Sequence, residues 1–190
     1  MNPTLPTSVE LLERALGYTR GRLALVTPAG LDAPTPCADW TLGALLAHMD
    51  DALDAFLEAS TGPVALTGDR TGRRDGVTVA GIQDKACALL GAWTAHAEGR
   101  RRSVAVGDRP VPAGLLVAAA ALEVTVHGWD VGRATGELAR IPAALAVALG
   151  PVAGALVTDE DRGLRFAEAR PVRPGAAPDH ALLAHLGRVP

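Results

Sequence analysis

Apolar residues recur every three or four positions over several long stretches of the chain, and this is the period of an amphipathic α-helix. The first stretch follows Thr7-Ser8-Val9-Glu10, which has the form of a capping box, and we expect its helix to end near Val26. The second begins after Asp39, a residue type that commonly caps helix N-termini, and continues to about Ala59. Each pattern predicts a helix that buries one face.

Two further long helices are predicted in the middle of the chain. One is expected from about residue 77 to residue 98. Pro112 is expected to be the first residue of the next, which continues to Ala134 and is followed by Gly136 as a C-terminal cap. Between these two helices, residues 103–106 have the pattern of a short extended piece.

The last third of the chain is less regular. A helix is predicted from Pro142 to about Val157, with Gly150-Pro151 as the point where it would break or kink, and Asp179 is expected to cap a final short helix. No internal repeat or linker divides the 190 residues. We therefore expect a single domain over residues 1–190, an all-α four-helix bundle with a short C-terminal arm.

Composition supports this class and narrows the range of partners. Hydrophobic residues make up 48% of the chain and charged residues 21%, which is typical of a globular protein. Aromatic residues are only 3%, so alanine and leucine, both strong helix formers, supply most of the apolar content. The net charge of −3 and the lack of a long basic run exclude an extended phosphate-binding surface, so no nucleic-acid partner is expected.

The chain carries no pattern of export or membrane insertion. Its N-terminus lacks a basic start followed by an apolar run, and the most apolar stretch, residues 111–126, contains Pro112 and Glu123. The two cysteines, Cys37 and Cys87, have neither the spacing of a metal knuckle nor that of a disulfide framework. These features predict a cytoplasmic protein.

The most informative polar residues are Glu123 and His127, which lie four positions apart in an otherwise apolar helix and so share one face. A buried carboxylate needs a partner, and from spacing alone either a hydrogen bond to His127 or a metal ion would serve. His48, at the border of the apolar stripe of the second helix, would by itself be a packing residue. Together the three could supply ligands to zinc, iron(II), nickel or manganese from facing helices.

Several neighbours could assist such a site. Asp130 could pair with Arg133 or hold the second nitrogen of a ligand histidine. Asp50 and Asp51 are expected to be solvated acids. Asp51 is in addition a weak candidate for a residue that contacts one of the metal ligands. Cys37 precedes a helix N-terminus, where thiolates are favoured, but the expected role is that of a small buried hydrophobe. The three tryptophans are expected to anchor the core; they are Trp40, Trp93 and Trp129.

Three segments together resemble a known family. Thr35-Pro36-Cys37-Ala38-Asp39-Trp40-Thr41 leads into Leu45-Leu46-Ala47-His48, and Glu123 leads through His127-Gly128-Trp129-Asp130 to Arg133. Leu182-Leu183-Ala184-His185-Leu186-Gly187-Arg188 is similar to the ending of single-domain members. These motifs resemble the mycothiol-dependent maleylpyruvate isomerase-type, DinB-like metal-binding proteins.

The resemblance implies a DinB-type bundle that holds a divalent metal, usually zinc, through His48, Glu123 and His127. Nickel or iron(II) would also suit these donors. The resemblance also implies binding or activation of a low-molecular-weight thiol such as mycothiol, for isomerisation or S-transfer. The isomerase itself resembles a two-domain protein, and this chain is too short to contain the second domain. The isomerase reaction therefore does not follow from the resemblance.

Three hypotheses are open at this point. The leading one is a metal-dependent enzyme in which the metal activates a thiol or water as nucleophile, with Asp51 or Asp130 as candidate acid or base. The second is a metal-containing protein that binds a small molecule or acts in a stress response without turnover. In the third, the triad binds no metal. An exposed bundle face could support a homodimer.

Overall fold

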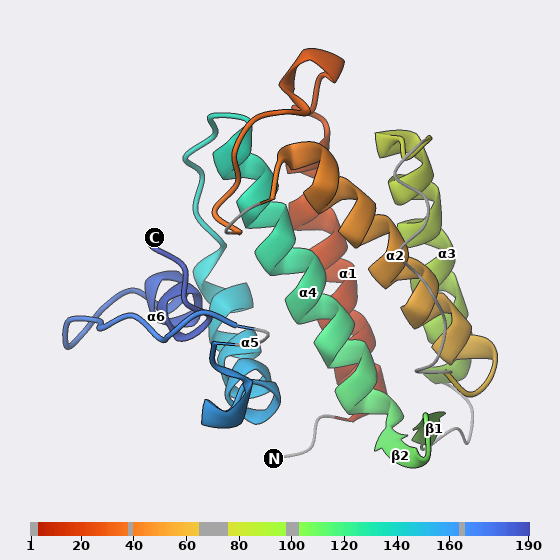
Figure 1. The fold of residues 1–190 in the computed structure, drawn as a ribbon. Coiled ribbons are helices and arrows are strands. Elements are labelled where there is room, and N and C mark those ends of the chain that lie inside the picture. Colours follow the sequence, from red (N-terminus) through yellow and green to blue (C-terminus); the bar gives the residue numbers. More distant parts are fainter. Residues whose placement is uncertain (1–3, 38–39, 65–75, 98–102, 164–165) are drawn as a thin grey trace.

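The computed structural model describes residues 4–37, 40–64, 76–97, 103–163 and 166–190 (Figure 1). Four long helices form a bundle, which confirms the predicted all-α class: α1 (Leu5–Leu23), α2 (Leu42–Thr61), α3 (Val79–Ala97) and α4 (Ala113–Ala134). The one sheet among the described residues is an antiparallel hairpin of β1 (Ser103–Val106) and β2 (Arg109–Pro112). A short 3₁₀ turn, Pro28–Gly30, lies between α1 and α2.

Helix α4 is the centre of the fold, and α1 and α4 pack along much of their lengths (Figure 1). Their close approach depends on Gly128, because a Cβ atom there would collide with the Thr19 side chain. The Thr19 hydroxyl donates a hydrogen bond of 2.7 Å to the Val124 carbonyl. The glycine next to His127 is thus required for helix packing, and this packing fixes the position of the polar residues of α4.

By length and composition, α4 is apolar enough to cross a membrane. However, 78% of its most apolar window is buried inside the fold, which is the arrangement of a core helix. Its apolar character is therefore used in packing against its neighbours.

Several predicted helix ends are wrong by a few residues. The capping box at Thr7 does not form, because α1 already begins at Leu5 and the Ser8 hydroxyl donates to the Thr4 carbonyl. Pro112 does not open α4: it pairs with Ser103 at the end of the hairpin, and the helix begins one residue later.

The other predicted helix ends have mixed outcomes. The expected cap Asp39 lies outside the described residues, and the Thr41 hydroxyl accepts a hydrogen bond from the Ala44 N–H at the start of α2. Residue 98, the expected end of α3, also lies outside the described residues. Gly136, with a φ of 84°, ends α4 as predicted.

The C-terminal arm consists of α5 (Ala143–Leu156), the 3₁₀ turn Asp159–Asp161 and α6 (Pro178–His185). It lies on one side of α4, opposite α3 (Figure 1). Of the two effects expected at Gly150-Pro151, a break or a kink, the break does not occur, because α5 continues through Pro151. The predicted Asp179 cap is also wrong: Ala177 occupies the cap position, and the Asp179 carboxylate instead accepts hydrogen bonds of 2.7 and 2.5 Å from Arg140.

Candidate metal centre

The structure brings together the three residues predicted to bind a metal. Nε2 of His48, on α2, lies 2.7 Å from Oε1 of Glu123, on α4. Nε2 of His127, one turn further along α4, lies 3.1 Å from the same oxygen. Two imidazole nitrogens thus converge on one carboxylate oxygen, and the three potential ligand atoms all lie within 4.8 Å of one another.

This cluster is partly open to solvent. The side chains of His48 and Glu123 are 37% and 31% exposed, whereas that of His127 is 8% exposed. Burial acts to raise the pKa of Glu123, but the charge of His127 and hydrogen bonds from both histidines outweigh it and hold the pKa well below its usual range. Glu123 is therefore a carboxylate at neutral pH.

The pKa of His127 is shifted in the opposite direction. Burial acts to lower its pKa, but the charge of Glu123 and a hydrogen bond to Asp130 outweigh burial and raise the pKa well above 6.5. Nε2 of His127 and Oε1 of Glu123 are thus paired within α4 at 3.1 Å, which is one of the two alternatives that the spacing left open. The donor set also fits a divalent metal, since one carboxylate and two imidazoles on facing helices can converge on a single ion once His127 loses its proton.

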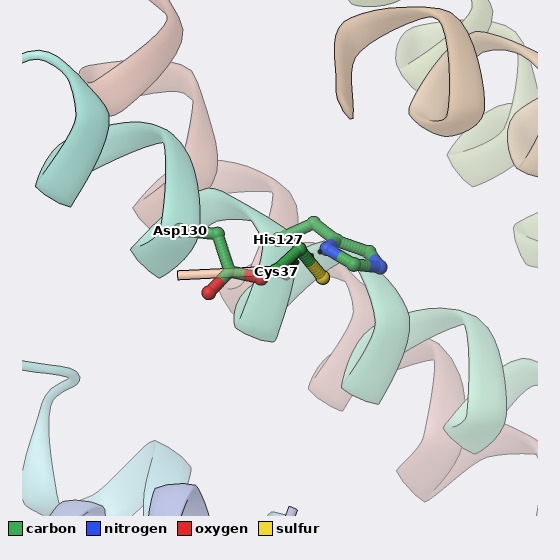
Figure 2. A group of neighbouring side chains, drawn as sticks. All are labelled: Cys37, His127 and Asp130. Carbon is green, nitrogen blue, oxygen red and sulfur yellow. Dashed lines mark hydrogen bonds and ion pairs between the residues drawn. The ribbon is translucent and has the colours of Figure 1, made fainter. Parts of the chain in front are cut away.

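A second group of side chains lies on the other side of the His127 ring. Oδ2 of Asp130 accepts a hydrogen bond of 3.0 Å from Nδ1 of His127, and Figure 2 shows Asp130 and Cys37 together on this side. Nη2 of Arg188 donates to Oδ2 of Asp130 at 3.0 Å and to Sγ of Cys37 at 3.0 Å. Asp130 thus fixes the orientation of the His127 ring, and Arg188 in turn fixes Asp130.

Of the two roles considered for Asp130, the structure shows the one on the histidine. Arg133 is not its partner: the guanidinium of Arg133 lies over the Trp129 ring, 5.5 Å from the ring centroid. The Asp130 side chain is fully buried, and burial acts to raise its pKa. The hydrogen bond from His127 and the charge of Arg188 nevertheless bring that pKa below its usual value.

Cys37 differs from its predicted role, whereas Trp40 is partly buried and packs against the core, as predicted. Cys37 is half-buried and lies against charged and polar atoms, so it is not a buried hydrophobe. The Trp40 ring packs against both imidazoles, with centroids 4.7 Å from His48 and 6.2 Å from His127. Trp93 and Trp129 are buried in the core, as predicted.

The acids that follow His48 do not join the cluster. Asp50 is not simply solvated: its carboxylate lies 2.7 Å from Nζ of Lys85, which also contacts Asp54, so this group ties α2 to α3. Among the described residues, Asp51 belongs to neither of the two groups around His127.

Arg188 was missed by the sequence analysis. It lies 58 positions from Asp130, in a segment without helical periodicity, and a single arginine in such a segment gives no local signal of a buried ion pair. The i, i+3 spacing of His127 and Asp130 did predict the hydrogen bond between these two side chains.

A cavity of about 300 Å³ lies directly beside the cluster, and both Glu123 and His127 line it. Its other lining residues come from α2, α4 and the C-terminal arm: Phe56, Ala119, Leu122, Val126, Leu156, Val157, Phe166, Leu186 and Arg188. A small molecule in this cavity would contact the candidate ligands.

Comparison with known proteins agrees with these features. The model of the mycothiol maleylpyruvate isomerase N-terminal domain family matches residues 12–132, which include His48, Glu123, His127 and Asp130. The chain belongs to this family. The suspected resemblance is thereby confirmed, and in this family member the C-terminal arm lies beyond the matched residues.

Relatives of this family member extend the match to most of the chain. Two uncharacterized proteins of Mycobacterium tuberculosis, from strains CDC 1551 / Oshkosh and ATCC 25618 / H37Rv, are each 28% identical over 178 residues, covering 93% of this chain and 94% of the relative. The aligned sequence is therefore long enough to include most of the residues of the C-terminal arm as well as those of the bundle.

Solved structures show that the fold is shared. The crystal structure of the mycothiol-dependent maleylpyruvate isomerase superposes with a TM-score of 0.58 at 20% identity, and so does that of a histidine-to-alanine mutant of it. The superposition covers 75% of this chain but only 66% of the isomerase chain. About a third of the isomerase chain therefore has no counterpart in the superposition.

Proposed function

We propose that His48, Glu123 and His127 hold one divalent metal, most suitably Zn²⁺, and that the site activates a low-molecular-weight thiol of the mycothiol type, or water, for S-transfer to or isomerisation of a small electrophile. The observation that carries the proposal is the convergence of two imidazole nitrogens on one ionised carboxylate oxygen at a partly open position. Membership of the mycothiol maleylpyruvate isomerase N-terminal domain family supports the choice of thiol.

A metal bound at such a site supplies a Lewis acid that lowers the pKa of a coordinated thiol or water, so that a nucleophile exists at neutral pH. Three protein donors leave a coordination position for that molecule. Glu123 is already ionised, whereas His127 must release its proton to solvent before it can act as a ligand, so metal affinity falls as the pH is lowered.

In this proposal Asp130 is a positioning residue and not an acid or base. It is fully buried, and its carboxylate is occupied by Nδ1 of His127 and by Arg188. By accepting a hydrogen bond from Nδ1–H it selects the tautomer in which Nε2 of His127 can be a ligand. Asp51 lies outside both groups, and we assign it no role.

Metal content is the first test. Purified wild-type protein should contain about one divalent ion per chain, and Glu123→Gln and His127→Ala should lose it. Glu160→Gln, at an exposed position of the arm, is the matched control and should retain the metal. Equal metal content in all four proteins would contradict the site.

Thiol titration of the cobalt-substituted protein is the second test. Direct sulfur ligation should produce a thiolate-to-cobalt charge-transfer band, and mycothiol should produce it at lower concentration than glutathione or cysteine. A spectrum that is indifferent to every thiol would exclude thiol activation. It would favour either water activation or the alternative of a metal-containing protein that binds a small molecule without turnover.

A further inference from the structure

The cavity beside the cluster has two walls of different origin. One wall comes from α2 and α4, and its α4 residues recur at positions 119, 122, 123, 126 and 127, which form one face of the helix. The other wall comes from the C-terminal arm through Leu156, Val157, Phe166 and Leu186. The arm therefore encloses a space that the bundle alone would leave open beside Glu123 and His127.

The lining is apolar except at one end. Eight of its eleven residues are aliphatic or aromatic, and the exceptions are Glu123, His127 and Arg188. Since Glu123 and His127 belong to the candidate metal cluster, a ligand in this cavity would have its reactive group near the cluster and the rest of its surface against hydrocarbon.

Arg188 is the one cationic side chain other than His127 in this lining, but its charge is already compensated. Its guanidinium donates to Asp130 and Cys37, and Nη1 donates to the Leu186 carbonyl at 3.1 Å. The Arg188 side chain is only 11% exposed, and the Asp130 carboxylate beside it is fully buried. A substrate carboxylate would have to compete with Asp130 for this arginine and would lie near the negative charge of Glu123.

We infer that this cavity binds the uncharged, apolar body of the electrophile and so makes the site selective for small electrophiles with a hydrocarbon substituent over dicarboxylates such as maleylpyruvate. The inference rests on the proposed function for the identity of the reaction. The binding step itself requires neither thiol nor turnover. The arm residues that line the cavity thus select the substrate.

Calorimetric titration of the full-length protein, with the metal it carries after purification, tests the inference. The probes are acetophenone, propiophenone, butyrophenone and valerophenone, which differ by one methylene each. Affinity should rise by about three- to fourfold per methylene until the cavity is filled. Succinate, a dicarboxylate, should bind at least about tenfold more weakly than valerophenone, because at most one of its carboxylates could reach the metal and the other would be desolvated against an apolar lining whose arginine is already paired with Asp130.

A pair of variants tests the location. Ala119→Phe places a ring in the cavity one turn before Glu123 and should abolish ketone binding, whereas Ala80→Phe, on the exposed side of α3, should leave it unchanged. Phe166→Ala, which enlarges the cavity from the arm side, should extend the rise in affinity to longer ketones. This second variant keeps the test decisive if Ala119→Phe does not fold.

The outcomes separate this inference from the proposed function. An affinity that does not change with chain length, tighter binding of succinate than of valerophenone, or equal ketone binding by Ala119→Phe would overturn the cavity assignment. Failure of the cobalt–thiol titration would overturn thiol activation but would not alter the ketone titration.

Discussion

The two sides of the His127 ring are built very differently. On the Nε2 side, His48 and Glu123 are each about one-third exposed. On the Nδ1 side, Asp130 is fully buried and Arg188 is 11% exposed. The same imidazole thus faces an accessible side at Nε2, where ligands can be exchanged, and fixed hydrogen-bond partners at Nδ1. This difference suggests that the open side determines what is bound and the closed side determines how His127 is oriented.

The energetic consequences should differ in the same way. A charged group that is removed from water needs a compensating partner, whereas a partly exposed group can be compensated by solvent. Substitutions on the closed side should therefore reduce the stability of the fold, and those on the open side should mainly reduce metal retention.

The largest effect on stability is expected for Asp130→Ala. It leaves the buried Arg188 without its anion and His127 without its Nδ1 acceptor, so the free energy of unfolding should fall by about 3–5 kcal/mol. Urea denaturation of the metal-free protein measures this. A loss below about 1 kcal/mol would show that the closed side is not a stabilising unit.

The next largest effect is expected for Arg188→Gln, and the quantity affected is the metal affinity of His48, Glu123 and His127. Without the guanidinium, Asp130 is less firmly held, and metal affinity should fall by about 10- to 100-fold although Arg188 is not a proposed ligand. Competition with a chelating dye measures the affinity. Arg173→Gln, in the exposed part of the arm, is the control and should leave the affinity unchanged.

A smaller effect is expected from the Arg140–Asp179 pair, which is remote from His127 and has one exposed partner. The hydrogen bonds from Arg140 lower the pKa of Asp179, so the pair stabilises the fold above the unfolded pKa of about 3.9 and this contribution is lost as the pH falls through the lower folded value. Asp179→Asn should cost about 1 kcal/mol at pH 7 and flatten the acid limb of the stability profile. An unchanged limb below pH 4 would contradict this assignment.

The smallest effect on the metal-free fold is expected for Glu123→Gln. Its side chain is 31% exposed, and the neutral amide can still accept from His48 or His127, so the free energy of unfolding should change by less than about 1 kcal/mol. Metal retention should nevertheless be lost. A destabilisation as large as that of Asp130→Ala would show that the two sides of His127 are not distinct.

Sequence periodicity predicted the four bundle helices and the face shared by Glu123 and His127, because both depend on local spacing. It also predicted His48 as their partner on a facing helix. It did not predict the contact of Arg188 or the arm residues of the cavity, since their neighbours are far away along the chain and local spacing carries no signal of such contacts. The misplaced Asp179 cap has a similar cause: a distant arginine competes for a carboxylate that local rules assign to the backbone.

The long sequence separations within this site have a consequence for folding. His48 and Glu123 are 75 positions apart, and Cys37 and Arg188 are 151 apart. Contacts of such high contact order close large loops and form after local helices. Recovery of metal binding during refolding would therefore report the docking of α2 on α4, and far-ultraviolet circular dichroism would report the earlier formation of helices.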